Sequence, residues 1–347
     1  MEIVMHPTGN EDDMDTTNHQ VRLAARPSGE PKPSDWAHTE EPVPTPAEGQ
    51  FLVRITHLSV DPAMRGWMND SRSYISGVEL NEVMRAIGAG EVVESRHPGF
   101  AAGDLVTGLF GVQEYALSDG EGVLVVDTSI APIPTYLSAL GMTGLTAYFG
   151  LFEVGALRDG ETVLVSGAAG AVGTMVGQLA KLKGCTVIGI AGGPEKCAML
   201  TDELGFDAAV DYRAGSLSRA LRAAAPDGVD VFVDNVGGEV LDAGLSVLRR
   251  GARVVISGAI SQYNSGEVVG PKHYLSLLVN RARMEGFVIF DYVDRYTEAG
   301  AELAGWLAAG KLHSKEHVVT GSIADFPETL LTLFRGENIG KLVLQYG

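Results

Sequence analysis

Three glycines spaced three residues apart are the first feature of this sequence that suggests chemistry. The stretch VSGAAGAVGTMVGQLAKLKG, residues 165–184, places them directly before an amphipathic helix pattern. A short apolar run precedes the glycines, and a second run ends near Ala191. This succession of strand, glycine turn, helix and strand can hold a dinucleotide pyrophosphate at a helix N-terminus. A turn without a ligand is the alternative. The residues predicted to contact phosphate are Gly167, Ala168, Ala169, Gly170, Ala171, Val172 and Gly173.

Each glycine position has a physical role in such a turn. Ala168 stands where the first glycine of the usual G-x-G-x-x-G pattern would be. Gly170 would let the backbone approach a phosphate, and Gly173 would let the helix pack closely on the strand. The pattern therefore departs from the usual one at a single position.

The end of the next strand indicates which dinucleotide is bound. NAD sites usually place a carboxylate there, on the ribose hydroxyls, but Ala191, Gly192 and Gly193 carry none. Lys196 follows within one turn, and an ammonium attracts a 2′-phosphate. Glu195 argues the other way unless it points elsewhere, and Lys196 could be only a solvated helix charge. We predict NADP(H) as the cofactor.

Composition excludes several other classes of protein. The 347 residues carry a net charge of −18, which is unfavourable for nucleic-acid binding. No run of about 18 apolar residues is present, so no membrane span is expected. Cys185 and Cys197 are the only cysteines, too few for a disulfide framework or a four-cysteine zinc site. We predict a cytoplasmic protein.

Two patterns of secondary structure divide the chain. Residues 51–160 contain short strand patterns broken by glycine and proline, as in a mostly β domain. From residue 161, five short apolar runs alternate with helix patterns, and residues 285–290 supply a sixth strand. Such runs indicate parallel strands buried on both faces, hence a doubly wound α/β fold. The fifth strand is predicted over residues 252–257, and the tail is expected to return to the first domain.

The motifs GMTGLTAYFGL, SGAAGAVG, KLKGC, AGGPEKC, DNVGG, GAISQYN and RMEGF occur in this order. Together they resemble the zinc-independent medium-chain dehydrogenases/reductases, in the branch of prostaglandin, 2-alkenal and curcumin reductases. The resemblance implies a GroES-like β domain, a Rossmann domain and a homodimer. We predict a disordered extension over 1–18, the GroES-like domain over 19–136, the Rossmann domain over 137–313 and the C-terminal return over 314–347.

The resemblance also implies roles for individual residues. Tyr263 would assist catalysis, Lys196 and Tyr212 would hold the 2′-phosphate, and Asn235 would face the cofactor. Further cofactor contacts are implied for Thr146, Ser257, Gly258, Ala259, Ile260, Ser261, Tyr263, Phe287, Val288, Ile289 and Asn338. One position departs from several animal members, which have tyrosine where this chain has Ala63. Substrates such as prostaglandins therefore do not transfer by analogy.

The expected chemistry follows from the absence of a thiolate in the first domain. No cysteine precedes Cys185, so that domain cannot supply the cysteine ligand of a zinc alcohol dehydrogenase, and His57 and His97 alone are insufficient. We predict no bound metal. Reduction of an α,β-unsaturated ketone or aldehyde needs none, because the carbonyl already activates the alkene. Tyr263, a ribose hydroxyl or water could stabilise or protonate the enolate. Quinone reduction and a non-catalytic NADP sensor or scaffold are the alternatives.

Overall fold

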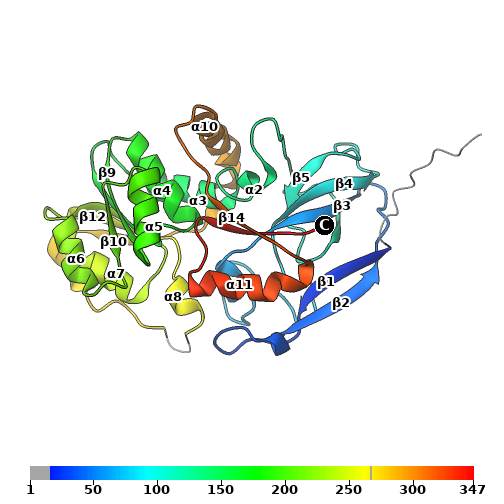
Figure 1. The fold of residues 1–347 in the computed structure, drawn as a ribbon, viewed down its shortest axis with the longest axis horizontal. Coiled ribbons are helices and arrows are strands. Elements are labelled where there is room, and N and C mark those ends of the chain that lie inside the picture. The colour runs from blue at the N-terminus through cyan, green and yellow to red at the C-terminus, as the bar shows by residue number, and fades with distance from the viewer. Residues whose placement is uncertain (1–15, 266–267) are drawn as a thin grey trace, which may run out of the picture.

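In the computed structural model, which describes residues 16–265 and 268–347, a six-stranded sheet forms one half of the molecule (Figure 1). Its strand order is β10-β9-β8-β11-β12-β13, and every neighbouring pair is parallel. The strands are β8 Thr162–Ser166, β9 Thr186–Ala191, β10 Ala208–Asp211, β11 Val229–Asp234, β12 Leu248–Ile256 and β13 Arg283–Gly286. The predicted doubly wound parallel sheet is confirmed.

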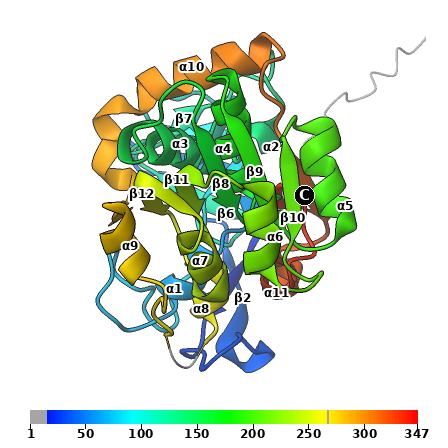
Figure 2. The same cartoon turned by 90° about the vertical axis from the view of Figure 1, so that its left-hand side faces the viewer.

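Both faces of this sheet are buried, which explains its near-continuous apolar strands. Val163 and Val165 enter a core shared with α3, α4 and α10, whereas Leu164 enters a second core shared with α6 and α7. The turned view shows α10 above the strands and α7 below them (Figure 2). The helices are α3 Met142–Phe149, α4 Ala171–Leu182, α6 Leu217–Ala224, α7 Gly238–Leu245 and α10 Tyr296–Ala308.

A seven-stranded sheet organises the other half, in the order β14-β15-β3-β4-β5-β7, with β6 paired to β3. The strands are β3 Phe51–Ser59, β4 Gly88–Ser95, β5 Leu105–Gly108, β6 Tyr115–Ser118, β7 Leu124–Val125, β14 Glu316–Thr320 and β15 Lys341–Gln345. β15 pairs antiparallel with β3, so the tail joins the seven-stranded sheet of the first domain, as expected. Helix α11, Phe326–Arg335, connects β14 to β15 along the chain. The domain boundaries at residues 136 and 313 stay predictions.

The N-terminal strand begins earlier than the expected extension allows. β1 Thr17–Leu23 pairs antiparallel with β2 Trp36–Pro42, so Thr17 and Asn18 belong to a sheet. The buried side chain of Asn18 donates to the Tyr115 carbonyl at 2.9 Å, which holds this end of the strand. Residues 1–15 of the predicted extension lie outside the described residues.

The shorter helices are α1 Ala63–Trp67, α2 Ile133–Tyr136, α5 Pro194–Ala198, α8 Ile260–Tyr263 and α9 Leu275–Asn280.

Two strand boundaries differ from the prediction. The predicted strand at 285–290 is β13, Arg283–Gly286, because its partner β12 ends at Ile256, opposite Gly286. The apolar run beyond it leaves the sheet, and the Phe287 ring packs against the helical segment that contains Gly150. β12 begins at Leu248, not at residue 252. Across the described part of the chain, each helix is too short or too polar to cross a bilayer.

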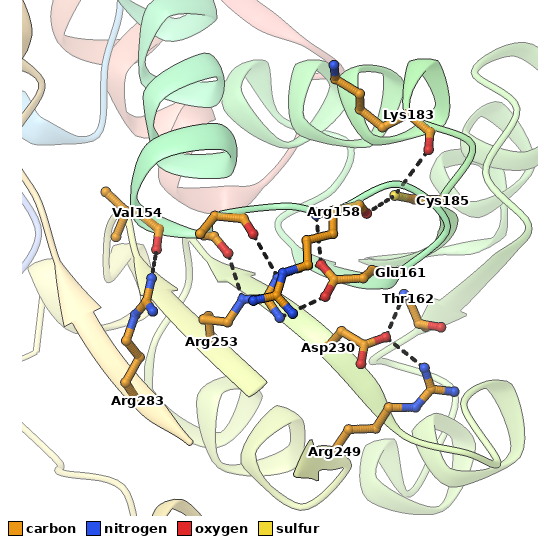
Figure 3. Close-up of polar contacts among 12 residues, drawn as sticks. Val154, Arg158, Glu161, Thr162, Lys183, Cys185, Asp230, Arg249, Arg253 and Arg283 are labelled. Atoms are coloured by element: carbon orange, nitrogen blue, oxygen red, sulfur yellow. Dashed lines mark hydrogen bonds and ion pairs between the residues drawn. The ribbon is translucent and has the colours of Figure 1, made fainter. Parts of the chain in front are cut away.

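At the amino ends of the parallel strands lies a network of satisfied charged groups (Figure 3). Arg253 donates to both carboxylate oxygens of Glu161 and to the Gly155 and Ala156 carbonyls. Asp230 accepts from the Thr162 amide at 2.9 Å and from Arg249 at 2.7 Å. Although burial opposes ionisation of Glu161, the hydrogen bonds from Arg253 and the Arg158 amide hold its pKa below the usual value. These contacts stabilise the starts of the strands.

Candidate active site

The predicted site residues gather at the opposite edge, beyond the carboxyl ends of the strands. They are Gly167 to Gly173 after β8, Lys196 after β9, Tyr212 after β10, Asn235 after β11, Ser257 to Tyr263 after β12 and Phe287 to Ile289 after β13. Ligands of doubly wound sheets bind along this edge, where the strand order reverses. The reversal lies between β8 and β11, at the glycine-rich loop. Lys196 and Tyr212 therefore lie toward one end of the edge, and Tyr263 and Phe287 toward the other.

The glycine-rich loop has the geometry of a tight turn into a helix. Gly167 has a φ of +56°, which favours glycine, and the amide of Gly170 closes the turn on the Gly167 carbonyl at 2.9 Å. A Cβ at Gly173 would lie 2.3 Å from the Gly167 carbonyl oxygen and 2.6 Å from Cα of Ala168. Any side chain there would push α4 off the loop. The first amides of α4 have no partner within the helix and can donate to an anion.

Tyr212 and Arg213 pack against Gly192, in the turn that leads into α5, the helix of Lys196. A Cβ at Gly192 would lie 2.8 Å from the ring of Tyr212 and 3.0 Å from Nε of Arg213. The guanidinium of Arg213 lies over that ring, 5.5 Å from its centroid. Burial and then the charge of Arg213 lower the pKa of Lys196, and Glu195 only partly opposes them. Two cations and a phenol thus form a patch that a phosphate group would neutralise.

Two carboxylates lie near this patch. Glu195 lines a surface depression with Asp202 and Lys315, and its charge partly opposes the lowering of the pKa of Lys196. Asp211 accepts from the Gly193 and Arg213 amides, both at 2.9 Å, and these hydrogen bonds lower its pKa. The Asp211 carboxylate therefore fixes the turn next to Lys196.

Asn235 is held in place by the end of β8. Its side-chain nitrogen Nδ2 donates to the Ser166 carbonyl at 2.8 Å, and its backbone N–H donates to Oγ of Ser166 at 2.9 Å. The Ser166 hydroxyl donates in turn to the buried carboxyl of Asp234 at 2.6 Å. Burial raises the pKa of Asp234 despite these hydrogen bonds. This chain of contacts orients Asn235 at the edge.

The segment from Ser257 to Ser261 packs on the loop that follows β11. The amides of Ser257 and Gly258 donate to the Asp234 carbonyl, at 2.9 and 3.2 Å. The amide of Ile260 donates to the Asn235 carbonyl at 3.3 Å, and the Ser261 hydroxyl donates to the Val236 carbonyl at 2.7 Å. The side chain of Ser261 is thus committed to the protein. The structure places these residues next to Asn235, and their contact with a cofactor stays a prediction.

Tyr263 ends this segment with its phenol turned back toward the strand ends. Its oxygen accepts from the Ala259 amide at 3.1 Å, so the hydroxyl proton is available to an acceptor. A Cβ at Gly258 would lie 3.3 Å from the phenol oxygen, which gives the glycine a steric role. Burial raises the pKa of Tyr263, although the Ala259 hydrogen bond opposes this, and Tyr74 and Asp234 raise it further. At neutral pH this phenol is a hydrogen-bond donor.

Phe287, Val288 and Ile289 present backbone at the far end of the edge. The ring of Phe287 points away, since a Cβ at Gly150 would lie 2.9 Å from it. The Ile289 carbonyl accepts from the Tyr296 hydroxyl at 2.9 Å. The contact predicted for these residues would thus involve their backbone.

Thr146 and Asn338 come from outside the strand ends. The Thr146 hydroxyl donates to the Met142 carbonyl at 2.7 Å within α3. The buried Asn338 donates to the Gly340 carbonyl at 2.8 Å, and the Gly340 amide donates to the Ala169 carbonyl at 2.7 Å. Asn338 is therefore beside the glycine-rich loop, but its amide nitrogen shapes the tail.

Two buried polar atoms of the described residues have no hydrogen-bond partner: Oδ1 of Asn264 and Nε1 of Trp67. Burial without a partner is unfavourable by about 1–3 kcal/mol, so such atoms indicate a missing ligand or water. Asn264 directly follows Tyr263 in the sequence, so this acceptor belongs to the segment that follows β12. Together with the glycine-rich loop and the basic patch, this acceptor fits a dinucleotide and a polar substrate.

Sequence reasoning missed two residues of the site. Arg213 directly follows Tyr212 in the motif VDYR, and its charge beside a predicted phosphate ligand could have revealed it. Tyr74 lies in the loop after α1, and its ring is 6.3 Å from that of Phe290. No local pattern marks Tyr74, because its contact with Phe290 arises only when the two halves of the molecule meet. As for metals, three or more His, Cys, Asp or Glu side chains nowhere cluster suitably within residues 16–265 and 268–347.

Comparison with known proteins identifies the family. Residues 19–126 match the family described as N-terminal domain of oxidoreductase, and residues 171–305 match the family described as zinc-binding dehydrogenase. The NADPH-dependent curcumin reductase of Escherichia coli is 40% identical over 334 residues, covering 94% of this chain and 96% of that enzyme. The NADP-dependent 2-alkenal reductase of Nicotiana tabacum is 38% identical over 336 residues, covering 95% and 98%. This chain belongs to the medium-chain dehydrogenases/reductases.

A solved structure of the same family agrees with the fold. CurA of Vibrio vulnificus in complex with NADPH is 43% identical, covers 95% of this chain and 99% of its own, and superposes with a TM-score of 0.90. The resemblance drawn from the sequence motifs, to the branch that includes curcumin and 2-alkenal reductases, is confirmed. The combination of a GroES-like β domain and a Rossmann domain is confirmed with it.

Proposed function

We propose that this protein uses NADPH to reduce the carbon–carbon double bond of α,β-unsaturated ketones and aldehydes. The observation that carries the proposal is the phenol of Tyr263, which is protonated, mostly buried and has a hydroxyl proton to donate. Relatives named curcumin reductase and 2-alkenal reductase support this reaction class.

The residues that would hold the cofactor form a line along the sheet edge. The cationic patch of Lys196 and Arg213, with Tyr212, suits the 2′-phosphate, because charge-assisted hydrogen bonds are stronger than neutral ones. The amides of the glycine-rich loop suit the pyrophosphate. Asn235, the segment from Ser257 to Tyr263 and the backbone after β13 would then flank the nicotinamide half.

The chemistry divides between the cofactor and the protein. NADPH supplies a hydride to the electron-poor β-carbon, and negative charge develops on the carbonyl oxygen. The Tyr263 hydroxyl donates a hydrogen bond where that charge develops, which stabilises the enolate. A phenol is protonated at neutral pH, and burial raises the pKa of Tyr263 further, so its hydroxyl acts as a donor. The enolate then takes a proton from Tyr263 or from water.

A screen of NADPH oxidation tests the proposal against its alternatives. Short enals, aryl enones and quinones are supplied one at a time, and products are identified by mass spectrometry. The proposal expects saturated ketones or aldehydes from the enals and enones. Turnover of quinones alone would indicate a quinone reductase, and NADPH binding without turnover of any class would indicate a sensor or scaffold.

We also propose a homodimer that forms at the free edge of the six-stranded sheet. β13 is the edge strand, and its four residues are exposed. The segments just before and after it in the sequence carry exposed apolar side chains, including Leu278, Val279 and Val293, each more than half exposed. An unpaired apolar edge favours pairing with a second copy across a two-fold axis. Light scattering that shows only monomer at working concentrations would refute the dimer.

The partners and compartment follow from composition. A net charge of −18 disfavours nucleic acid as a partner, and small electrophilic alkenes need no charged docking surface. Two free cysteines and no disulfide among the described residues fit a reducing compartment. We therefore propose a cytoplasmic enzyme with small-molecule substrates.

A further inference from the structure

The C-terminal tail contacts the candidate site at three successive points. The Gly336 carbonyl accepts from Lys196 at 2.8 Å, at the end of α11. The Gly340 amide donates to the Ala169 carbonyl, on the glycine-rich loop, at 2.7 Å. Lys341, the next residue, reaches the loop that leads into α1. A segment of six residues thus joins the basic patch, the phosphate loop and the first domain.

Lys341 forms an ion pair in the interior of the protein. Its side chain is 1% exposed, and Nζ donates to the Val60 carbonyl at 2.7 Å and to Oδ1 of Asp61 at 2.9 Å. The Ser59 hydroxyl donates to the other oxygen of Asp61. Burial lowers the pKa of Lys341, and Asp61 opposes that shift. Both charges are therefore held in one fixed geometry.

Stability alone is a poor reason for such a pair. A buried ion pair contributes little compared with apolar residues of the same size, because both charges lose their hydration. The backbone beside it is also constrained. Gly340 has a φ of +70°, and a Cβ there would lie 2.0 Å from the Lys315 carbonyl oxygen. Gly340 and Lys341 are consecutive, and they contact the glycine-rich loop and the Asp61 loop, respectively. The Asp61 loop is residues 60–62, between β3 and α1.

The Asp61 loop leads from β3 into α1 and so belongs to the first domain. Helix α1 begins at Ala63, and the Val78 amide closes the following loop on the Trp67 carbonyl at 2.7 Å. Tyr74 lies within that loop, and its ring centroid is 6.3 Å from that of Phe290, in the segment that follows β13. Movement of Asp61 would thus move Tyr74 relative to the segment at the carboxyl end of β13.

We propose that Lys341 is a positioning residue that holds α1 and the Tyr74 loop at a set distance from the glycine-rich loop. This inference rests on the proposed function for the reaction that is positioned, but the placement itself does not. A displacement of about 1 Å in a substrate-positioning element can lower a rate about 100-fold. Lys341 acts through Asp61 and α1, and not on the reacting atoms.

The test compares two double variants that each remove a buried ion pair without leaving a lone charge. Lys341→Met with Asp61→Asn removes the pair in the tail. Arg253→Met with Glu161→Gln removes the matched pair at the other edge of the sheet. Melting temperature, NADPH affinity by fluorescence, kcat/KM with an enone, and hydrogen exchange of the amides in residues 60–67 are measured for both.

We expect the tail variant to fold, to bind NADPH nearly as wild type, and to lose about 10- to 100-fold in kcat/KM. Its amides in residues 60–67 should exchange faster, whereas the control should change only in melting temperature. Unchanged exchange and unchanged kcat/KM would overturn the proposal and leave Lys341 a packing residue. If wild type reduces no enone, the proposed function fails, and the exchange data alone decide the role of Lys341.

Discussion

The two edges of the six-stranded sheet use polar side chains in opposite ways. At the amino edge, Arg253, Glu161, Asp230 and Arg249 satisfy one another and nearby backbone groups (Figure 3). At the carboxyl edge, Lys196 has three donor hydrogens and, within the part of the chain that the structure describes, one hydrogen-bond partner, the Gly336 carbonyl. Farther along, and again among the described residues, Tyr263 accepts one hydrogen bond and Oδ1 of Asn264 accepts none.

This difference in hydrogen bonding distinguishes polar groups that stabilise the fold from polar groups that can bind a ligand. A buried charge with all its hydrogen bonds made stabilises one conformation and offers nothing to a substrate. A buried donor or acceptor without a hydrogen-bond partner costs free energy. A ligand that pairs with it removes this cost, which favours binding. Variants at the carboxyl edge should therefore change catalysis, and variants at the amino edge should change stability.

The largest effect is expected from Tyr263→Phe, which keeps the ring and removes the hydroxyl. If the hydroxyl stabilises the developing enolate, kcat should fall about 10- to 1000-fold while NADPH affinity stays nearly the same. Stopped-flow or steady-state kinetics with a reactive enone measure this loss. A loss confined to NADPH binding would make Tyr263 a cofactor ligand, and no change in either would make it a packing residue.

Lys196→Ala should weaken NADPH binding and leave NADH binding nearly unchanged. An ammonium–phosphate contact is typically worth about 1.5–3 kcal/mol, or about 10- to 150-fold in affinity. Lys181→Ala is the matched control, because Lys181 pairs with Asp207 away from the basic patch. Equal losses for both cofactors would contradict the assignment of Lys196 to the 2′-phosphate.

Glu161→Gln should lower the free energy of unfolding by about 3 kcal/mol, because Arg253 would lose its buried counter-charge. The kcat/KM of the folded enzyme should not change. The pKa of Glu161 is lowered in the folded state, so its stabilisation is present above about pH 4.3 and is lost as the pH falls through the folded pKa. The difference between wild type and variant should shrink in acid, as denaturant titrations at several pH values would show. A Glu161→Gln variant with full stability but reduced kcat/KM would contradict the assignment of the amino edge to stability and of the carboxyl edge to catalysis.

The smallest effect is expected from chelators. The first domain has no cysteine, so a thiolate-bound catalytic zinc is not predicted. EDTA should leave kcat unchanged, and elemental analysis should find no stoichiometric zinc. One zinc per chain that is lost together with activity would refute this expectation.

Much of the carboxyl edge was predictable because its residues follow strands in a regular order. The glycine-rich loop, Lys196 and Tyr212 each come directly after an apolar run, and parallel strands bring such positions together. The end of β13 was not predictable, because the apolar character of Phe287 serves a helix contact and not the sheet. Tyr74 and the Lys341–Asp61 pair were not predictable either, since 280 residues separate Lys341 from Asp61. Local patterns predict elements, whereas contacts between the two halves depend on how those halves pack.

The central claim is that hydride reaches the β-carbon of an activated alkene. NADPH labelled with deuterium at the transferable position is oxidised with an aryl enone, and the product is examined by NMR spectroscopy and mass spectrometry. We predict a saturated ketone with deuterium on the β-carbon and a solvent-derived proton on the α-carbon. Deuterium on a carbinol carbon would show that the carbonyl is reduced instead, and would contradict the proposed function.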